Sequence, residues 1–322
     1  MCNDILHTPS IECHVQLKAQ KQPYKTAVEW SGGKLTYRQL WDAATAKAVQ
    51  LKHKGVTRGC LHLFRTTQDG SFIVSYIATH LIGAVAVPLG ADLPSNAYGD
   101  LVARYSNIRI AAKGDTSKDI ADVLFTTGST GKQKGVMLSY QAIMADTENL
   151  IEAQGFSAET VFVVCGPLNH IGSLSKIWPV LVQGGTLVIL DGMKNLSAFF
   201  EAFRSHEGKL ATFMVPASIR LLLGMEHGEL RAVADKIDFL ETGGAAITQP
   251  DMEALCSALP TARLYNTYAS TETGIICTYD YNHNPCTAGC LGLPMVNSTV
   301  EITADGRIAC GGKTLMSGYL QD

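Results

Sequence analysis

Residues 125–135 read Phe125-Thr126-Thr127-Gly128-Ser129-Thr130-Gly131-Lys132-Gln133-Lys134-Gly135, the most informative stretch of the sequence. It overlaps an apolar run, Val123–Thr127, that predicts a buried strand. Glycines allow the backbone to turn tightly and to direct its N–H groups at an anion. Hydroxyl side chains and lysines add donors and positive charge, so the stretch predicts a loop that binds a polyphosphate. A surface turn rich in Gly, Ser and Thr is the alternative interpretation.

A P-loop kinase or GTPase is the competing class of phosphate-binding protein. Its pattern, G-x-x-x-x-G-K-[ST], can be aligned on Gly131-Lys132. The first glycine of the pattern then falls on Thr126, and the final hydroxyl residue falls on Gln133. Two defining positions fail, and we set this class aside.

The composition predicts a globular protein without a polyanionic partner. The chain has 322 residues, of which 46% are hydrophobic and 17% are charged, enough apolar material for a buried core. The formal net charge is -3, and the basic residues are scattered along the chain. We therefore expect no nucleic-acid partner.

Cysteine usage and the N-terminus predict a cytoplasmic protein. The nine cysteines are an odd number without a repeating spacing, and Met1–Ser10 lacks the pattern of a secretory signal. His283, Cys286 and Cys290 lie close together in the sequence, but their spacing is not that of a standard zinc site. A thiol-containing loop is the preferred interpretation.

The uncharged run Ser71–Ala91 is about as long as a membrane span. Gly83 and Pro88 divide it, so we expect a helix followed by a buried strand, and no membrane span. Elsewhere, apolar runs alternate with helix-like segments, which is typical of α/β folds. Expected strands are Thr26–Trp30, Lys34–Tyr37, Leu61–Phe64, Ala84–Pro88, Val161–Val164, Thr186–Leu190, Lys236–Thr242, Val300–Thr303 and Arg307–Cys310; expected helices are Gln39–Lys52, Ser71–Ile82 and Tyr140–Gln154.

The 125–135 stretch resembles the phosphate loop of the adenylate-forming superfamily, [ST]-[SG]-G-[ST]-T-G-x-P-K-G, with Gln133 in place of the usual proline. That superfamily contains acyl-CoA synthetases, peptide-synthetase adenylation domains and luciferases. Further segments resemble family motifs in the family's order: Thr26–Tyr37, Gly83–Leu89, Pro167–His170, Gly243–Ile247, Tyr268–Glu272, Gly292–Pro294 and Gly318-Tyr319. The resemblance covers nearly the whole chain.

The resemblance implies an α/β fold with two helix-flanked β-sheets plus a smaller β-rich lobe, a distorted barrel, in roughly the last third. It implies that residues 1–322 form the N-terminal AMP-binding domain. The implied reaction joins a carboxylic acid to the α-phosphorus of ATP with Mg²⁺, and coenzyme A then accepts the acyl group. In the family, a small C-terminal domain follows, whose lysine bridges the carboxylate and the α-phosphate. No such domain is seen after Tyr319, so we expect the chain alone to bind nucleotide but to show little adenylation.

By the same resemblance, the phosphate loop holds the β- and γ-phosphates. Its implied ligands are Thr126, Thr127, Gly128, Ser129, Thr130, Gly131 and Lys134. Glu272 is the implied Mg²⁺ ligand, and Thr271 donates to the α-phosphate. A favourable position at a helix N-terminus is the structural alternative for Glu272.

Adenine is expected against the backbone of Gly243, Gly244 and Ala245, with Asn266, Thr267 and Tyr268 as further residues that bind the nucleotide. Tyr268 is expected to stack on the base and Asn266 to read its amino edge. Ala269 replaces the family's usual glycine beside them. His170 is expected either to orient the reacting carboxylate or to be structural.

The residues expected around the acid indicate which class of acid is bound. Leu168-Asn169-His170 lacks the aspartate by which amino-acid-activating relatives pair the substrate ammonium, which disfavours an amino acid. The expected pocket segments are mostly apolar and favour a fatty or aryl acid: Ile171–Trp178, Thr212–Arg220 and Gly274–Cys277. Lys176 or Arg220 is a candidate partner for a second carboxylate, as in o-succinylbenzoate, or points to solvent. A nucleotide-binding protein without turnover is the rival function.

Overall fold

The computed structural model describes residues 10–127, 133–225 and 227–321. Among these residues, the smaller of the two large sheets has the spatial order β3-β4-β5-β6. Its strands are β3 (Leu61–Arg65), β4 (Val85–Leu89), β5 (Ile120–Thr127) and β6 (Gln133–Ser139). The first three strands are parallel, and β6 returns antiparallel to β5. The segment 128–132, which contains most of the predicted phosphate loop, lies outside the described residues.

The larger sheet runs β13-β12-β11-β10-β9-β7-β8-β1-β2 within the described ranges. Its strands from β11 to β1 are parallel to their neighbours, whereas β2, β12 and β13 pair antiparallel. The bounds are β1 (Thr26–Trp30), β2 (Gly33–Thr36), β7 (Thr160–Val164), β8 (Thr186–Ile189), β9 (Lys209–Met214), β10 (Ile237–Thr242), β11 (Arg263–Ser270), β12 (Gly274–Asp280) and β13 (Leu293–Pro294).

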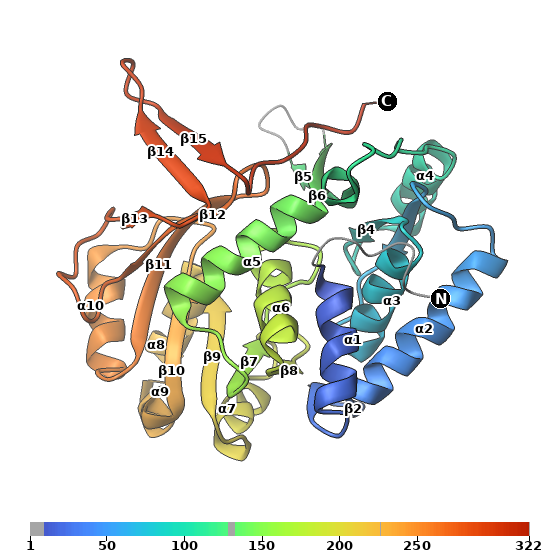
Figure 1. The fold of residues 1–322 in the computed structure, drawn as a ribbon. Coiled ribbons are helices and arrows are strands. Elements are labelled where there is room, and N and C mark those ends of the chain that lie inside the picture. Colours follow the sequence, from blue (N-terminus) through green and yellow to red (C-terminus); the bar gives the residue numbers. More distant parts are fainter. Residues whose placement is uncertain (1–9, 128–132, 226, 322) are drawn as a thin grey trace.

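Helices fill the space between the two sheets and cover their outer faces (Figure 1). The inner layer is α1 (Ile11–Lys21), α2 (Tyr37–His53), α3 (Gly70–Leu81), α5 (Tyr140–Gln154) and α6 (Ile171–Gln183). On the outer face of the larger sheet lie α7 (Leu196–Ser205), α8 (Pro216–Met225), α9 (His227–Ala232) and α10 (Gln249–Ala258), and α4 (Ser95–Tyr105) covers the smaller sheet. Along β4, Ala86 faces the inner layer while Val85 and Val87 face α4, as the alternation of a strand requires. This layered arrangement confirms the predicted α/β class.

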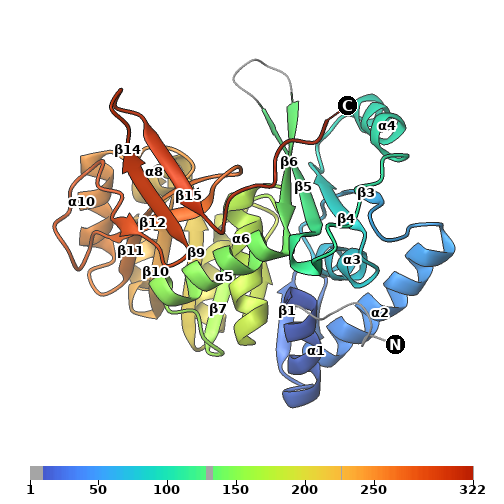
Figure 2. The same cartoon turned by 45° about the horizontal axis from the view of Figure 1, so that its top comes forward.

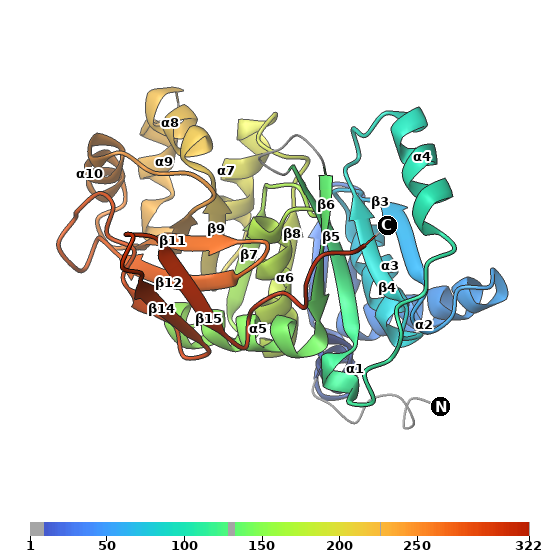
Figure 3. The ribbon, with the colours of Figure 1, turned by 90° about the horizontal axis from the view of Figure 1, so that it is seen from above.

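The last third is richer in strands, as predicted, but it does not form a closed barrel among the described residues. β11 and β12 belong to the larger sheet, and a separate two-stranded sheet, β14 (Ser298–Ile302) and β15 (Ile308–Gly312), projects from it. Seen from above, this hairpin and α4 lie at opposite ends of the molecule (Figure 3). The expected helix Tyr140–Gln154 is α5 and the expected strand Thr26–Trp30 is β1, while the ends of the other expected elements differ by one to three residues.

A buried charged network connects the first helix to the smaller sheet. His80 of α3 contacts Glu12 of α1 through Nδ1 (2.5 Å) and Asp122 of β5 through Nε2 (2.8 Å). Tyr76 Oη donates to the second oxygen of Asp122 (2.7 Å), and Trp178 Nε1 of α6 donates to Tyr76 Oη (3.0 Å). Burial alone would lower the pKa of His80, but the two carboxylates raise it to about 10. We infer that the imidazolium joins α1, α3 and β5 in the inner layer.

This network predicts that stability depends on pH. Burial alone would raise the pKa of Glu12, yet the charge of His80 lowers it below its ordinary value of 4.5. The contribution of Glu12 is therefore present above pH 4.5 and is lost as the pH falls below it. The contribution of His80 is complete below its ordinary pKa of 6.5 and is lost as the pH rises toward 10.

Urea unfolding at several pH values measures this dependence. We expect the free energy of unfolding to be higher between pH 5 and 6.5 than at pH 9.5 or pH 3.5. His80→Leu should flatten the alkaline decline. An alkaline decline of the same size in that variant would contradict the assignment to His80.

Candidate active site

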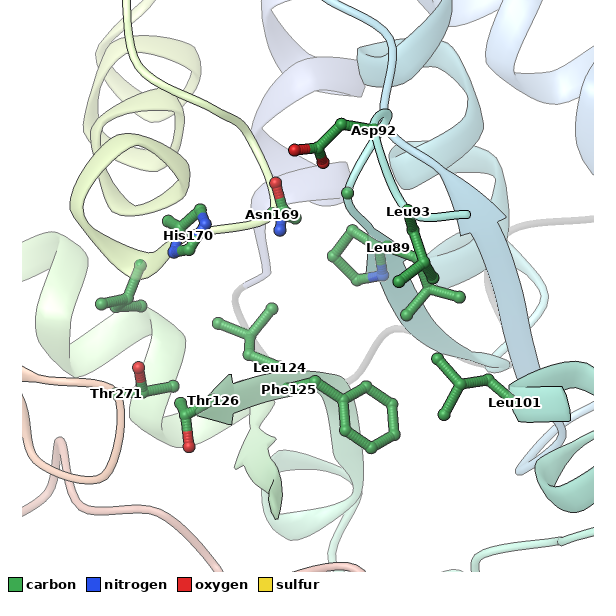
Figure 4. Close-up of a pocket in the computed structure, with 13 residues that line it drawn as sticks. Leu89, Asp92, Leu93, Leu101, Leu124, Phe125, Thr126, Asn169, His170 and Thr271 are labelled. Atoms are coloured by element: carbon green, nitrogen blue, oxygen red, sulfur yellow. The ribbon is translucent and has the colours of Figure 1, made fainter. Parts of the chain in front are cut away.

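A pocket of about 450 Å³ opens between the carboxyl ends of the two sheets. Thr126 of β5, Thr271, and His170 at the start of α6 all line it, so three predicted site residues from distant segments converge. Figure 4 shows these side chains on the same side of the pocket, opposite Leu93 and Leu101. The sequence interpretation assigned no role to several other lining residues: Gly90, Asp92, Leu93, Leu101 and Asn169.

The phosphate-loop residues can be placed in part. Thr126 pairs with Lys134 across β5 and β6, so these two positions lie on either side of residues 128–132. Thr127 is the last residue of β5. The predicted ligands Gly128, Ser129, Thr130 and Gly131 lie outside the described residues.

Tyr319 connects Lys134 with Glu272. The Tyr319 hydroxyl donates to Glu272 Oε1 (3.1 Å), and Lys134 Nζ lies 5.1 Å from the centroid of its ring. The C-terminal segment is held beside β6 by Leu320 N–H donating to Gly135 O (2.7 Å), as can be followed in Figure 2. The sequence contained Tyr319 as part of a motif, but it did not indicate this bridging position.

Glu272 lies in the turn between β11 and β12, so the alternative of a helix N-terminal carboxylate is wrong. Its backbone carbonyl accepts from Met316 N–H (2.8 Å). No group of three or more His, Cys, Asp or Glu side chains that could hold a metal ion is found within the described ranges. A half-exposed carboxylate fits Mg²⁺ in this setting because the ion commonly takes substrate phosphates and water as its other ligands.

Lys134 is exposed at the edge of this site and provides a test of phosphate binding. We expect Lys134→Ala to weaken ATP binding about tenfold and AMP binding less than about twofold, because the ammonium would contact a terminal phosphate. Isothermal calorimetry with both nucleotides measures the difference. The exposed Lys113 provides the control variant Lys113→Ala, and equal losses for ATP and AMP in Lys134→Ala would contradict the assignment.

The predicted adenine residues lie together at the carboxyl ends of parallel strands, a common position for ligands in α/β sheets. β10 ends at Thr242, directly before Gly243, Gly244 and Ala245, and Asn266 is opposite Thr242 in β11. The Asn266 side chain donates through Nδ2 to Cys290 O (2.9 Å). The carbonyl of Cys290 can only accept, so it must face the amide nitrogen Nδ2. The amide oxygen Oδ1 then remains available to accept a hydrogen bond from a ligand. Such an acceptor suits the amino group of adenine.

Gln249 fixes the loop that supplies this carbonyl. Its Nε2 donates to Cys286 O (2.7 Å), and its Oε1 accepts from Ala288 N–H (2.6 Å). Tyr268, the predicted stacking residue, is half-buried two positions after Asn266 in β11, and Thr267 packs its Cβ near Gly243. Thus the loop 286–290 orients the amide of Asn266.

Replacing Asn266 therefore tests base selection. We expect Asn266→Asp to keep an acceptor but to lose the bond to Cys290 O, which weakens ATP binding about fivefold or more. Asn266→Ala should also reduce the preference for ATP over GTP, because guanine carries an oxygen where adenine carries the amino group. Competition binding with both nucleotides measures this ratio. An unchanged ratio in Asn266→Ala would show that Asn266 does not read the base.

His170 is the N-cap residue of α6, and its side chain makes no capping hydrogen bond. It is exposed and lines the pocket at the positive end of the helix. This position favours an anion, so it is consistent with orienting a carboxylate. It also permits a purely structural interpretation.

The two candidate cations of the acid pocket have different environments. Arg220 Nη1 pairs with Asp251 Oδ2 (3.0 Å), and the Arg220 side chain is 51% exposed. Lys176 Nζ lies 2.8 Å from Glu241 Oε1, with both side chains fully buried. Of the two alternatives for Lys176, exposure to solvent is therefore wrong, and its ammonium is already paired with the carboxylate of Glu241.

The family matched by the chain is described as AMP-binding enzyme, over residues 15–109 and 106–320. The chain belongs to this family, whose members activate acids as acyl-adenylates. Phenyloxazoline synthase MbtB of Mycobacterium tuberculosis is 27% identical over 94% of the chain and 24% of its own length. Surfactin synthase subunit 2 of Bacillus subtilis is 24% identical over 94% of the chain and 10% of its own length. The chain thus spans less than a third of these curated relatives.

Solved structures show the same fold. The N-terminal subdomain of Klebsiella oxytoca NpsA, in complex with 3-hydroxyanthranilyl-AMSN, superposes with a TM-score of 0.84 at 18% identity. The match covers 98% of this chain and 90% of that chain. VinN superposes with a TM-score of 0.81 at 20% identity, covering 98% of this chain and 91% of that chain. Among the described residues, no helix is long and apolar enough to cross a membrane.

Proposed function

We propose that this chain activates a small carboxylic acid as its adenylate and supplies the acyl group to the thiol of a carrier protein. The convergence of Thr126, His170 and Thr271 on one pocket is the observation that carries the proposal. A carboxylate and the α-phosphate of ATP must meet in one place for this reaction, and positioning dominates its catalysis.

The proposed roles follow the geometry. Thr126, Lys134 and the phosphate-loop residues between them in the sequence would hold the β- and γ-phosphates, and Glu272 would hold Mg²⁺. Thr271 would donate to the α-phosphate, while the positive end of α6 with His170 would orient the acid. Gly243–Ala245, Asn266, Thr267 and Tyr268 would enclose adenine. Mg²⁺, when bound, would neutralise charge on the departing pyrophosphate.

A carrier protein is preferred over coenzyme A because the curated relatives of the chain include a protein named nonribosomal peptide synthetase. Coenzyme A is the second candidate, supported by the resemblance of the motifs to acyl-CoA synthetases. Both acceptors present the same kind of extended thiol arm, so the pocket alone does not favour either.

One assay separates these possibilities. The chain is incubated with ATP, Mg²⁺ and octanoate, benzoate or o-succinylbenzoate, and acyl-adenylate is detected by mass spectrometry together with released pyrophosphate. A carrier protein bearing its thiol arm, or coenzyme A, is then added and thioester is measured. We expect acid-dependent adenylate in low yield, because the chain alone is expected to show little adenylation, and any thioester on the carrier in preference to coenzyme A. Nucleotide binding without any acid-dependent pyrophosphate would instead support the rival function, a nucleotide-binding protein without turnover.

A further inference from the structure

Two buried side chains of helix α5 bind the backbone of Ile275, the second residue of β12. Asp146 Oδ1 accepts from Ile275 N–H (2.9 Å), and Asn149 Nδ2 donates to Ile275 O (3.1 Å). Both side chains are buried. They are three positions apart in the sequence, so they lie on the same face of the helix. One face of α5 therefore satisfies both hydrogen-bonding groups of a single strand residue.

Asp146 is an unusual residue for the buried face of a helix. Helices pack on sheets through apolar side chains, and α5 contributes Ile143 and Leu150 to the core in this way. A carboxylate is rarely buried, and burying it is destabilising unless it is bonded. Burial raises the pKa of Asp146 to about 7, although the bond from Ile275 N–H and the charge of Lys176 lower it. The contact with the backbone of Ile275 is the interaction that offsets this burial.

The turn between β11 and β12, which carries Glu272, is a compact unit that packs on Asp146. Reciprocal bonds close it, because Ser270 N–H donates to Thr273 Oγ1 (3.1 Å) and Thr273 N–H donates to Ser270 Oγ (3.2 Å). Gly274 follows with a φ of +72°, and a Cβ there would come within 3.4 Å of Asp146 Cγ. A displacement of the strand at Asp146 would therefore move the whole turn, including the carboxylate of Glu272.

Helix α5 also connects this turn with the phosphate-loop side of the site. Its N-cap residue is Ser139, the last residue of β6, and Lys134 lies in the same strand. Figure 1 shows α5 running from β6 across to β11 and β12. Asp146 is seven residues after Ser139, about 10 Å along the helix axis. The two halves of the candidate site are thus fixed to one helix.

We propose that Asp146 is a positioning residue for the candidate active site: by holding Ile275, it sets the position of Thr271 and Glu272 relative to the phosphate loop. This inference rests on the proposed function. Thr271 and Glu272 would bind a phosphate oxygen and Mg²⁺, and such ligands act well only when they are held within about 0.5 Å of their productive positions. Residues that orient a metal ligand commonly change metal affinity by about 10–100-fold when they are replaced.

The test measures ATP binding to the full chain by calorimetry, once with Mg²⁺ and once with EDTA. The ratio of the two dissociation constants reports how much the metal contributes. Asp146→Val removes the acceptor for Ile275 N–H, whereas Asp146→Asn retains an oxygen that can accept from it. The matched control is Thr147→Val, which removes the buried bond from Thr147 Oγ1 to Ile143 O (2.7 Å) in the same helix. We expect Asp146→Val to reduce the Mg²⁺ ratio about tenfold or more, and the other two variants to keep it within about twofold.

Hydrogen exchange of the Ile275 amide provides a readout that does not require the metal. We expect fast exchange in Asp146→Val and protection in Asp146→Asn. On the unchanged chain, Mg²⁺ and ATP together should slow exchange of this amide about fivefold or more, because binding and the position of the turn are coupled in both directions. The exposed Glu301 amide on β14 should not change. This measurement on the unchanged chain decides the question if Asp146→Val does not fold, and an Ile275 amide unaffected by Mg²⁺ and ATP would overturn the inference.

The outcomes separate this inference from the proposed function. A folded Asp146→Val chain that keeps the Mg²⁺ ratio of the unchanged chain would overturn the inference and leave the proposed function in place. A loss of equal size in Asp146→Asn or Thr147→Val would also overturn it. An unchanged chain that binds ATP equally with Mg²⁺ and with EDTA would overturn it together with the role of Glu272. A folded chain that binds no ATP would overturn the proposed function itself.

Discussion

Glu272→Gln is expected to reduce acid-dependent pyrophosphate exchange on the order of a hundredfold or more, relative to the unchanged chain. Glutamine preserves an oxygen that can accept from the Tyr319 hydroxyl, whose bond to Glu272 is 3.1 Å long. The local fold should therefore persist while the negative charge is lost. Mg²⁺ prefers charged oxygen ligands, so the remaining activity should require a higher Mg²⁺ concentration.

Pyrophosphate exchange measured across a range of Mg²⁺ concentrations provides the test, and Glu301→Gln is the matched control. Glu301 is exposed on β14, in the hairpin that projects from the larger sheet. Full activity of Glu272→Gln at the same Mg²⁺ concentration as the unchanged chain would exclude Glu272 as a metal ligand.

His80→Leu is expected to lower the free energy of unfolding by about 3–5 kcal/mol at pH 7, because it leaves two buried carboxylates without their cation. Glu12 and Asp122 are both fully buried beside this histidine. Leucine retains much of the side-chain volume, so the loss would reflect charge rather than a cavity. Urea unfolding measures the difference.

His62 provides the control for this variant. It lies on β3, where its Nδ1 pairs with Thr79 Oγ1 (2.7 Å), and burial lowers its pKa to about 4. This histidine is therefore neutral at pH 7, and His62→Leu should cost only about 1 kcal/mol. Equal losses for the two variants would show that the charge on His80 does not stabilise the fold.

The fold could be predicted because its decisive motifs are local. A strand that ends in a glycine turn, such as the one ending at Thr242, shows an apolar run followed by glycines that allow the backbone to turn. Both features can be recognised within a short stretch of sequence. The sequence could not predict how the strands of the last third are divided between the larger sheet and the separate two-stranded sheet. Whether β11 and β12 join the larger sheet depends on pairing between distant strands, which no local pattern records.

The candidate site was predictable where a motif carries its own chemistry, as at Thr126 or Thr271. The sequence analysis did not single out Glu241. This residue is two positions after Phe239 in β10, so its side chain projects from the same apolar face of the strand. Lys176 is the only charged residue of the otherwise apolar helix α6, which indicates a buried helix. The pairing of these two residues depends on the packing of α6 against the sheet, and neither segment alone contains it.

Binding of a non-reacting acyl-adenylate analogue is the most direct test of the central claim that the Thr126–His170–Thr271 pocket is an adenylate-forming site. Calorimetry should show that an acyl-sulfamoyladenosine binds at least about a hundredfold more tightly than AMP or the free acid, because it fills both halves of the site at once. Its binding should also raise the melting temperature with saturation. A folded chain that binds the analogue no more tightly than AMP would contradict the account.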